Sequence, residues 1–337
     1  MIKYMEKFEH NDFIEFLKIN WNSNHIYVKD TSYFEYEFSD SSNFVLAVRD
    51  NKIVAVLGYL EYEKKGDIFN AIWKNIGKAD DGLKCFQFLL NENFKSVSSC
   101  GIKKNTIPIY EFLGINTGRL KHYYILNLEI KDYKIAKISK KPTKSIEYKR
   151  RSDIIEVKNI NELLSLIDYQ NLKKYNFYKS PEYFNKRYFE HPYYKYHILV
   201  KSINTNSILV YRIVKENGGS CIRIMDFLGD EKEFNELISY LVEKMFQEKH
   251  EYIDIYEIGL EDITLENSGF LERFENDVNI IPNYFEPFVQ KNIEIYYMSN
   301  CKDKFRMFKG DGDQDRPSIV KEKKDEEWSN YCHVSLY

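Results

Sequence analysis

Two histidines in the first half of the chain, His25 and His122, are suited to moving protons near neutral pH. An imidazole has an intrinsic pKa of about 6.5, so its neutral form can accept a proton as a general base. His25 lies in a polar segment, and His122 lies in an alternating, β-rich run. We predict both as catalytic candidates. The alternative for each is a surface or hydrogen-bonded structural histidine.

The second half carries polar residues in apolar surroundings: Arg187, His191, Arg212 and Asp226. Arg187 and His191 are four residues apart, so on a helix they share one face and can hold a phosphate together. Asp226 follows the strand-like run 222–225, near the edge where sheets bind ligands. We predict all four as substrate-binding residues. The alternative is that they are solvated residues at strand ends.

The elements that must position these side chains occur twice in the same order. In the first copy a helical pattern leads to three strand-like runs, a glycine-bearing turn and a second helix: 12–21, 43–49, 52–59, 68–73, 77–82 and 83–90. The second copy repeats that layout: 160–169, 197–200, 207–214, 221–227, 228–231 and 234–246. Strands that alternate with helices indicate mixed α/β sheets. We therefore predict two related α/β domains.

The boundaries follow from two closing strands. The run 120–126 closes the first domain and the run 293–298 closes the second. A Lys-rich stretch of little periodicity separates the domains. The predicted division is a first domain over 1–131, a linker over 132–153, a second domain over 154–299 and a C-terminal tail over 300–337.

The composition limits the partners. The net charge is −3 and the pI about 6.2, which gives no overall attraction to nucleic acid or acidic membranes. No apolar run approaches the ~20 residues that span a bilayer, and the charged N-terminus does not resemble a signal peptide. Five scattered cysteines show no metal-ligand spacing. We expect a cytoplasmic protein with a small-molecule partner, no nucleic acid, no membrane span and no metal.

The order of elements resembles the GNAT superfamily of acyl-CoA-dependent N-acyltransferases. Two phrases, Ile281-Pro-Asn-Tyr-Phe-Glu-Pro287 and Met307-Phe-Lys-Gly-Asp-Gly-Asp-Gln-Asp-Arg-Pro317, resemble more specifically the tandem GNAT proteins of bacterial surface-polysaccharide gene sets. The resemblance implies two GNAT-like domains with mixed sheets. It also implies transfer of an acyl group from acetyl-CoA, or another acyl-CoA, to an amino sugar, in particular a nucleotide-linked one.

The superfamily binds the pyrophosphate of CoA at a turn with the pattern [RQ]-x-x-G-x-[GA] between a strand and a helix. Backbone N–H groups and a helix N-terminus face the phosphates there, and glycine permits close approach. The best match is Lys78-Ala-Asp-Asp-Gly-Leu-Lys84, which predicts a cofactor site at Lys78, Asp81, Gly82, Leu83 and Lys84. The first basic position and the second glycine depart from the pattern. An ordinary capped turn is the alternative, because Asp81 is also a good N-cap residue.

The corresponding turn of the second domain, 229–233, is acidic with one glycine. We therefore expect the first domain to bind the donor and the second to supply acceptor contacts. The resemblance further implies that a tyrosine next to His122, Tyr123 or Tyr124, protonates the leaving thiolate, and we predict Tyr123. Trp73, at the end of the third strand-like run, joins the predicted substrate-binding set.

The tail contains carboxylates at i, i+2 and i+4 in Asp311-Gly-Asp-Gln-Asp315, as at the start of a calcium loop, with Glu322 at the twelfth position. Arg316 stands at the sixth position, where such loops need glycine. The alternatives are a tail that reaches the substrate through Lys309 or Arg316 and a purely structural tail.

Three functions compete at this stage. The first is the acyl-CoA-dependent N-acyltransferase. The second is a Fem-like aminoacyl transferase, which needs a basic channel for tRNA that the charge balance does not favour. The third is a non-catalytic ligand-binding or scaffold protein with degenerate GNAT domains.

Overall fold

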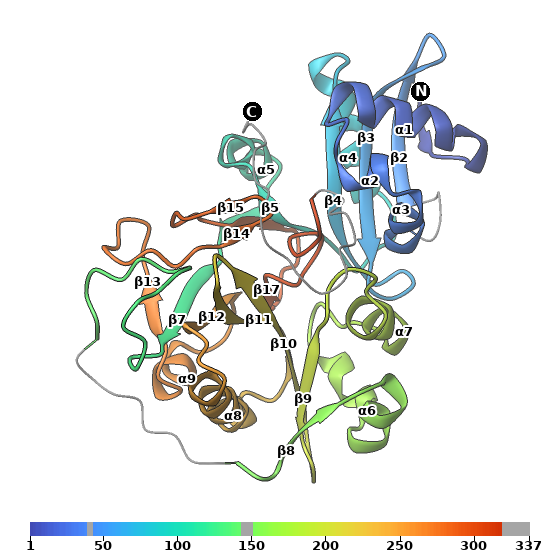
Figure 1. Ribbon diagram of the computed structural model, residues 1–337. Coiled ribbons are helices and arrows are strands. Elements are labelled where there is room, and N and C mark those ends of the chain that lie inside the picture. Colours follow the sequence, from blue (N-terminus) through green and yellow to red (C-terminus); the bar gives the residue numbers. More distant parts are fainter. Residues whose placement is uncertain (39–42, 143–150, 319–337) are drawn as a thin grey trace. The chain divides into compact units, whose positions relative to one another are not determined.

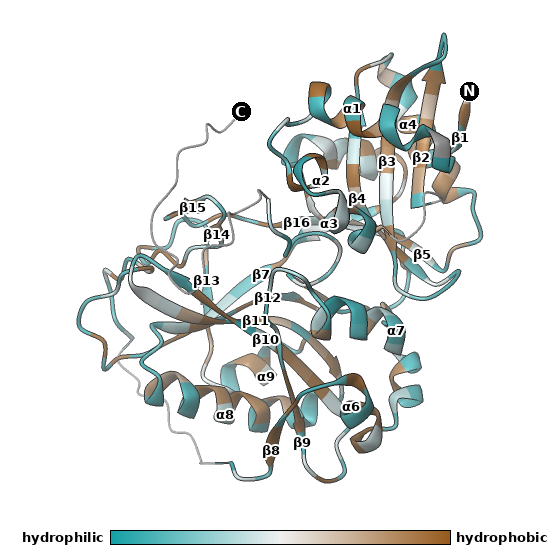
Figure 2. Ribbon diagram, turned by 45° about the vertical axis from the view of Figure 1, so that its right-hand side comes forward, coloured by the Kyte–Doolittle hydropathy of each residue, from teal (hydrophilic) through white to brown (hydrophobic). Residues whose placement is uncertain are grey.

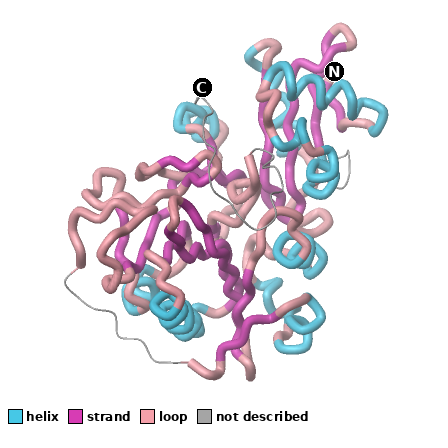
Figure 3. The backbone as a smooth tube through the Cα atoms, viewed as in Figure 1, coloured by secondary structure: helices cyan, strands magenta, loops and turns pink. Residues whose placement is uncertain are grey.

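The computed structural model describes residues 1–38, 43–142 and 151–318. The described chain forms two compact units. The first contains Met1–Gly118, Tyr296–Asp303 and the described residues after 310; the second contains Arg119–Ile295 and Lys304–Gly310. Each is built on one large mixed sheet, coloured magenta in Figure 3. Neither unit is continuous in sequence.

The first unit has a seven-stranded sheet in the order β1-β2-β3-β4-β5-β16-β6. Its strands are β1 Ile2–Tyr4, β2 Phe44–Arg49, β3 Lys52–Glu61, β4 Asp67–Asn75, β5 Ser96–Ile102, β16 Tyr296–Ser299 and β6 Asn116–Arg119. Its helices are η1 Lys7–Glu9, α1 His10–Asn20, α2 Ile26–Lys29, α3 Thr31–Glu37, α4 Ala79–Leu90, η3 Lys104–Thr106 and α5 Ile107–Phe112. The predicted first copy is present with small shifts of its ends. Gly114 follows α5 with a φ of +71°, as expected at a helix C-terminus.

Two apolar layers fix this sheet. On one face Cys85, Phe86 and Leu89 of α4 pack against Val45 and Ile68 of the strands. Elsewhere the core is aromatic, with Phe13 of α1 and Phe34 of α3 stacked around Phe44 of β2. Paired aromatic rings contribute about 0.5–1.5 kcal/mol each beyond their buried area. These layers orient α4 and the turn before it.

The second unit has an eight-stranded sheet in the order β13-β7-β12-β11-β10-β9-β8, with β17 paired to β12. Its strands are β7 Lys121–Leu126, β8 Ile154–Val157, β9 His197–Lys201, β10 Ser207–Glu216, β11 Gly219–Gly229, β12 Tyr252–Ile258, β13 Leu271–Arg273 and β17 Met307–Phe308. Its helical segments are α6 Ile160–Leu166, η4 Tyr169–Lys174, α7 Pro181–Phe184, the π-turn η5 Asn185–Phe189, η6 Glu231–Glu233, α8 Phe234–Gln247 and α9 Asp262–Asn267.

The strands of this sheet alternate between two cores, so both faces are covered (Figure 1). Leu209 and Ile224 face α8 and α9, whereas Val210 and Met225 face α6 and α7. The strands are correspondingly hydrophobic (brown in Figure 2), and α8 alternates in colour because only one side packs on the sheet. The predicted strand-like runs 197–200, 207–214 and 221–227 correspond to β9, β10 and β11, whereas β8, β13 and β17 were not predicted.

The closing strands are the main correction to the predicted division. The run 120–126 forms β7, which pairs antiparallel with β12 of the second sheet, and not with the first sheet. The run 293–298 contributes β16, which pairs antiparallel with β5 of the first sheet. A strand's own residues indicate that it is extended but not which sheet accepts it. The two halves of the chain have therefore exchanged their closing strands, and the boundaries at 131 and 299 do not match the units.

The described part of the predicted linker is also ordered. Ile135 and Ala136 are buried, and the Glu251 carboxylate accepts backbone N–H bonds from Lys134, Ile135 and Ala136. The segment 280–289 contains the short pair β14 Tyr284–Phe285 and β15 Phe288–Val289 around a cis Glu286–Pro287 bond. The Lys-rich composition of the predicted linker concealed the buried positions Ile135 and Ala136.

Candidate active site

A cavity of about 380 Å³ lies in the second unit. The loop between η4 and α7, the end of β11, the loop after β12 and the segment 304–308 line it. Its charged lining residues are Lys174, Lys179, Lys304, Arg306, Asp226, Glu231 and Glu261. Aromatic side chains, including Tyr175 and Phe305, supply much of the rest. A cavity of this size with a few convergent charges is typical of a small-molecule site.

The cavity forms where two parallel strands separate. The parallel register of β11 and β12 runs from Ile222↔Ile253 to Ile224↔Ile255. Beyond it, β17 pairs with β12, and the Gly310 N–H donates to the Met225 carbonyl of β11 at 2.8 Å. The carboxyl ends of parallel strands are the usual position of ligand sites in open α/β sheets.

A β-bulge directs Asp226 to this position. The register of β10 with β11 shifts between Val210 and Tyr211, so Met225 is the extra residue and Asp226 pairs with Val210. A bulge re-aims the side chain that follows it. Asp226 is 1% exposed and lines the cavity. It lies inside β11, which continues to Gly229, and not after the end of the strand as the sequence indicated.

Asp226 has two neighbours that the sequence did not single out. Lys179 Nζ lies 2.9 Å from Asp226 Oδ2, and the Tyr188 hydroxyl donates to the same oxygen at 2.6 Å. Lys179 is 2% exposed. Lys179 and Tyr188 therefore fix the position of the Asp226 carboxylate at the cavity wall.

Tyr188 also connects Asp226 to the other predicted substrate residues. Its ring meets Tyr196 at 5.2 Å, and Arg187 and His191 both lie against Tyr196. These contacts bring Arg187, His191 and Asp226 into one cluster. Arg187 and His191 do not share a helical face, because η5 ends at Phe189; Tyr196 joins them instead.

Arg212 reaches the same cluster through Tyr194. Its guanidinium lies 4.2 Å from the centre of the Tyr194 ring, and His191 stacks on that ring at 5.0 Å. Lys309 is close in sequence to β17; its N–H donates to the Tyr256 carbonyl, and its ammonium lies over the Tyr256 and Tyr284 rings. Lys309 and Tyr284 belong to the two phrases that carried the family resemblance.

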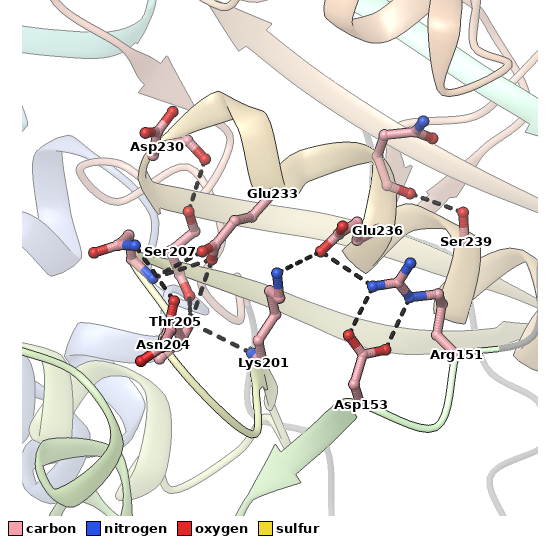
Figure 4. Close-up of polar contacts among 12 residues, drawn as sticks. Arg151, Asp153, Lys201, Asn204, Thr205, Ser207, Asp230, Glu233, Glu236 and Ser239 are labelled. Carbon is pink, nitrogen blue, oxygen red and sulfur yellow. Dashed lines mark hydrogen bonds and ion pairs between the residues drawn. The ribbon is translucent and has the colours of Figure 1, made fainter.

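The acidic turn after β11 is held by its own hydrogen bonds. Glu233 accepts from the Asn206 N–H and the Thr205 hydroxyl, and the Asp230 carbonyl accepts from Ser207 (Figure 4). Glu231 accepts from the Glu261 N–H and the Thr264 hydroxyl and pairs with Arg306 at 2.5 Å. The acidic residues therefore connect loops around the cavity.

The predicted CoA turn of the first unit is closed by its own carboxylate. Asp81 Oδ2 accepts the Lys78 N–H at 2.8 Å, and Arg49 makes a two-pronged contact with the Asp81 carboxylate at 2.6–3.0 Å. The hydrogen bond from Arg49 lowers the pKa of Asp81 to about 2. The Asp81 carboxylate therefore occupies a backbone N–H group that a phosphate would need. These residues do not fit a bound pyrophosphate.

The other residues of the predicted turn also make contacts within the first unit. α4 begins at Ala79, so Gly82 lies within its first turn rather than before it. The Trp73 indole donates to the Gly82 carbonyl at 3.2 Å and covers that residue. Lys84 pairs with Asp80, and Leu83 is a partly buried helix residue. Trp73 thus serves the core beside α4.

His25 occupies a structural position in the first unit. It caps α2 by accepting the Tyr27 N–H, and its Nε2 lies 2.7 Å from Arg316. Burial, with Arg316 adding to it, lowers the pKa of His25 to about 3. Arg316 also pairs with Asp313 and stacks on Tyr27. These contacts favour the structural interpretation of His25 and of the described part of the tail.

His122 is fully buried in an ionic network of the second unit. Asp254 contacts its Nε2 at 3.0 Å, and Arg273 donates to its Nδ1 at 2.8 Å. Burial lowers the pKa of His122 to about 4 although Asp254 opposes the shift. Arg223 pairs with Asp254 at 2.6 Å and completes the network. Because both ring nitrogens are engaged, the contacts do not favour a general base.

Tyr123 points to the opposite face of β7 from His122. Its hydroxyl donates to Asp262 at 3.0 Å, and burial raises its pKa. The nearby Glu257 is buried, and this burial raises its pKa to about 8. Neither residue lines the cavity. The three predicted catalytic residues, His25, His122 and Tyr123, therefore lie apart, and each makes its own structural contacts.

Sequence reasoning missed Lys179, Tyr188 and Arg306. Lys179 stands one residue before the cap of α7 in Phe177-Tyr-Lys-Ser-Pro181, where a lysine between an aromatic run and a helix start could have been noticed. Tyr188 is one of 28 tyrosines, and nothing local distinguishes it. Arg306 contacts residues about 75 positions away, so only the fold reveals it.

No protein-family model and no curated protein matches this chain. Solved structures do. A GCN5-related N-acetyltransferase from Anabaena variabilis has a TM-score of 0.56 and 10% identity, covering 89% of this chain and 72% of that one. The GCN5-related N-acetyltransferase from Kribbella flavida gives 0.53 and 8%, covering 89% and 71%.

A protein of unknown function from Enterococcus faecalis V583, described as a probable N-acyltransferase, has a TM-score of 0.57 and 9% identity, covering 89% of this chain and 71% of that one. The chain has a GNAT-like fold. The mixed-sheet, GNAT-like architecture predicted from the sequence is thereby confirmed. Identities this low speak to the fold alone.

Metal-ligand clusters and membrane-spanning helices bear on the expected partners. Over 1–38, 43–142 and 151–318, no group of three or more His, Cys, Asp or Glu side chains is placed to hold a metal ion. Glu322 of the considered calcium loop lies outside the described residues. No helix in the described part of the chain is long and apolar enough to cross a membrane.

Proposed function

We propose that this protein is an N-acyltransferase that uses an acyl-CoA donor, with its reaction centre in the cavity of the second unit. The single observation that carries the proposal is Asp226, a buried carboxylate paired with Lys179 and placed by a β-bulge at the opening between two parallel strands of a GNAT-like sheet. A buried, paired carboxylate in a cavity is a candidate for proton transfer.

The chemistry requires few groups. The amine nitrogen of the acceptor attacks the thioester carbonyl carbon, a C–N bond forms, and the C–S bond breaks with its electron pair on sulfur. Asp226 accepts the proton that the amine loses, directly or through a water molecule. Tyr188 donates to one Asp226 oxygen, and Lys179 pairs with the same oxygen, so both position the carboxylate. The cavity supplies the proximity that makes the attack effectively unimolecular.

This assignment places the donor in the second unit, whereas the sequence favoured the first. In the first unit Asp81 accepts the Lys78 N–H of the turn, and Arg49 holds the Asp81 carboxylate in that place. In the second unit four cationic side chains line the cavity, and these suit a phosphate-bearing donor. We infer that the first unit is a structural partner without donor chemistry.

The acceptor we propose is an amino sugar, in particular a nucleotide-linked one, for the assembly of a surface polysaccharide. Its support is the resemblance of the two sequence phrases, together with the Arg187, His191 and Arg212 cluster. The guanidinium and imidazole groups can bind a phosphate, and the tyrosine rings beside them can pack against a flat ring of the ligand. The alternatives, a scaffold and a Fem-like transferase, become outcomes of the test.

The test is to incubate the full chain with acetyl-CoA and a panel of nucleotide-linked amino sugars. Release of free thiol and the mass of the N-acylated product report transfer. We expect product with at least one acceptor and none with the Asp226→Asn variant. Binding of acetyl-CoA without product from any amine would support a scaffold. Transfer that needs aminoacyl-tRNA would support the Fem-like alternative.

A further inference from the structure

Lys179 places a primary amine inside the cavity to which acyl transfer is assigned. The residue is only 2% exposed but lines the cavity, so its Nζ is reached from the cavity and not from the outer surface. Nζ lies 2.9 Å from Asp226 Oδ2. An amine therefore stands within hydrogen-bond distance of the carboxylate that is proposed to accept the proton of a reacting amine.

The backbone around Lys179 is held on both sides. The Tyr169 hydroxyl donates to the Lys179 carbonyl at 3.1 Å, and the next residue, Ser180, is the N-cap of α7. Two residues earlier, Phe177 has a φ of +61°, and its ring lies 4.9 Å from the Phe305 ring. A backbone conformation of this kind persists only where the surrounding structure holds it. The Lys179 side chain therefore extends into the cavity from a fixed backbone.

A second lysine of the same cavity provides a contrast. Lys174, the last residue of η4, lines the cavity but is exposed, and its Nζ lies over the Tyr175 ring at 5.2 Å. A reagent that attacks amines according to their accessibility reacts with Lys174 before Lys179. A reaction that needs a positioned proton acceptor favours Lys179, which is paired with Asp226. The order of the two lysines therefore separates chemistry in the cavity from labelling of the surface.

We propose that Lys179 is a self-acylation site, to which the cavity transfers the acyl group of an acyl-CoA when no acceptor is bound. The inference rests on the proposed function, which brings the thioester to this cavity. From the ammonium form, Nζ gives one proton to Asp226 and attacks the thioester carbonyl carbon. A C–N bond forms, and the C–S bond breaks with its electron pair on sulfur. The second proton lost by the nitrogen passes to the sulfur, so the products are an N-acyl lysine and the CoA thiol.

Acylation changes the cavity in two ways. The product is a neutral amide, so the charge that lysine places beside Asp226 is lost. The acyl group also occupies part of a cavity of about 380 Å³. Self-acylation should therefore slow later transfer to a free amine, whereas an acceptor that already occupies the cavity protects Lys179. The ratio of donor to acceptor would then set the activity.

The experiment is peptide mass spectrometry of the full chain after incubation with acetyl-CoA and no acceptor amine. We expect Lys179 to be acetylated about tenfold faster than Lys174, because a positioned base contributes more than exposure does. The N-hydroxysuccinimide ester of acetic acid, which needs no site, is the matched probe and should label Lys174 first. With acetyl-CoA, Asp226→Asn should slow acetylation of Lys179 about a hundredfold and leave that of Lys174 unchanged.

The ester also guards the test against misfolding. If Asp226→Asn opens the structure, the ester labels Lys179 and Lys174 alike, and the order of the two lysines in the wild type then decides alone. A second variant, Lys179→Arg, keeps a cation beside Asp226 but removes the acyl acceptor. Preincubation with acetyl-CoA should slow later transfer by the wild type and cause no such loss in Lys179→Arg.

Two results would overturn the site: acetylation of Lys179 no faster than that of Lys174, or equal rates at Lys179 in the wild type and a folded Asp226→Asn variant. Acetylation of Lys179 in the predicted pattern, without transfer to any free amine, would retain the site and reject the amino-sugar acceptor. Transfer to a free amine, with Lys179 unmodified when the acceptor is omitted, would retain the proposed function and reject self-acylation.

Discussion

The two units share the same arrangement of strands and the same β-bulge but differ in the residue that follows the bulge. In the first, β3 shifts against β4 so that Ala71 is the extra residue and Gly58 pairs with Ile72. In the second, β10 shifts against β11 so that Val210 pairs with Asp226. Ile72 and Asp226 thus occupy the same place after the bulge. The comparison teaches that the sheet geometry is kept in both units, whereas an ionisable group stands there only in the second.

The largest expected effect is on catalysis through this difference. Asp226→Asn removes the proton acceptor and should lower the acyl-transfer rate at least a hundredfold, since positioned general bases contribute about 10²–10⁴-fold. The rate is measured with saturating acyl-CoA and amine. Ile72→Val, at the matched position of the first unit, should leave the rate unchanged at a cost of about 0.5–1.5 kcal/mol in stability. Equal losses for both variants would contradict the assignment.

The second comparison concerns how each unit is held together. The second unit buries Arg223, Asp254, His122 and Arg273 in one ionic network, whereas the first relies on aromatic rings around Phe44. Asp254→Asn leaves the buried Arg223 without its paired carboxylate and should cost about 3–5 kcal/mol. Urea unfolding monitored by circular dichroism measures it. Asp80→Asn, on the exposed pair with Lys84, is the control and should change little.

The third expectation is a pH dependence that belongs to the second unit. Burial raises the pKa of Glu257 to about 8, so the folded state holds a proton that the unfolded chain releases near pH 4.5. The contribution to stability is therefore fully present below pH 4.5 and decreases until about pH 8, by roughly 2–4 kcal/mol. Urea unfolding at pH 5 and pH 8 should show this loss in wild type and a smaller one in Glu257→Gln. A loss of equal size in the variant would assign it to other groups.

The smallest effect is expected at the closed turn of the first unit. The pKa of Asp81 is lowered to about 2, so its contribution to stability is present above about pH 4 and lost as the pH falls toward 2. Asp81→Asn should slightly lower the melting temperature at pH 7 and leave pyrophosphate affinity unchanged. Weaker binding of CoA to this variant would restore the first unit as the donor site.

The fold class was predictable because period-two and helical patterns reflect local packing, which β10, β11 and α8 follow closely. The partners of β7 and β16 were not, since alternation says nothing about which distant strand completes a ladder. Within the site, Asp226 was singled out because a charge after an apolar run is a local signal, although β11 continues past it to Gly229. Lys179 and Arg306 could not, because their partners lie 47 and 75 residues away. The turn match at 78–84 misled because Arg49, far upstream, determines what Asp81 does.

The exchanged strands also govern how the gene can be divided. A fragment that ends at a conventional midpoint, near residue 150, would lack β16, which pairs with β5 in the first sheet. A fragment that starts there would lack β7, the neighbour of β12 in the second sheet. Each half would expose an unpaired strand edge and invite aggregation. Each half of the chain therefore supplies a strand that completes the sheet of the other half. We expect neither half to fold when it is expressed without the other.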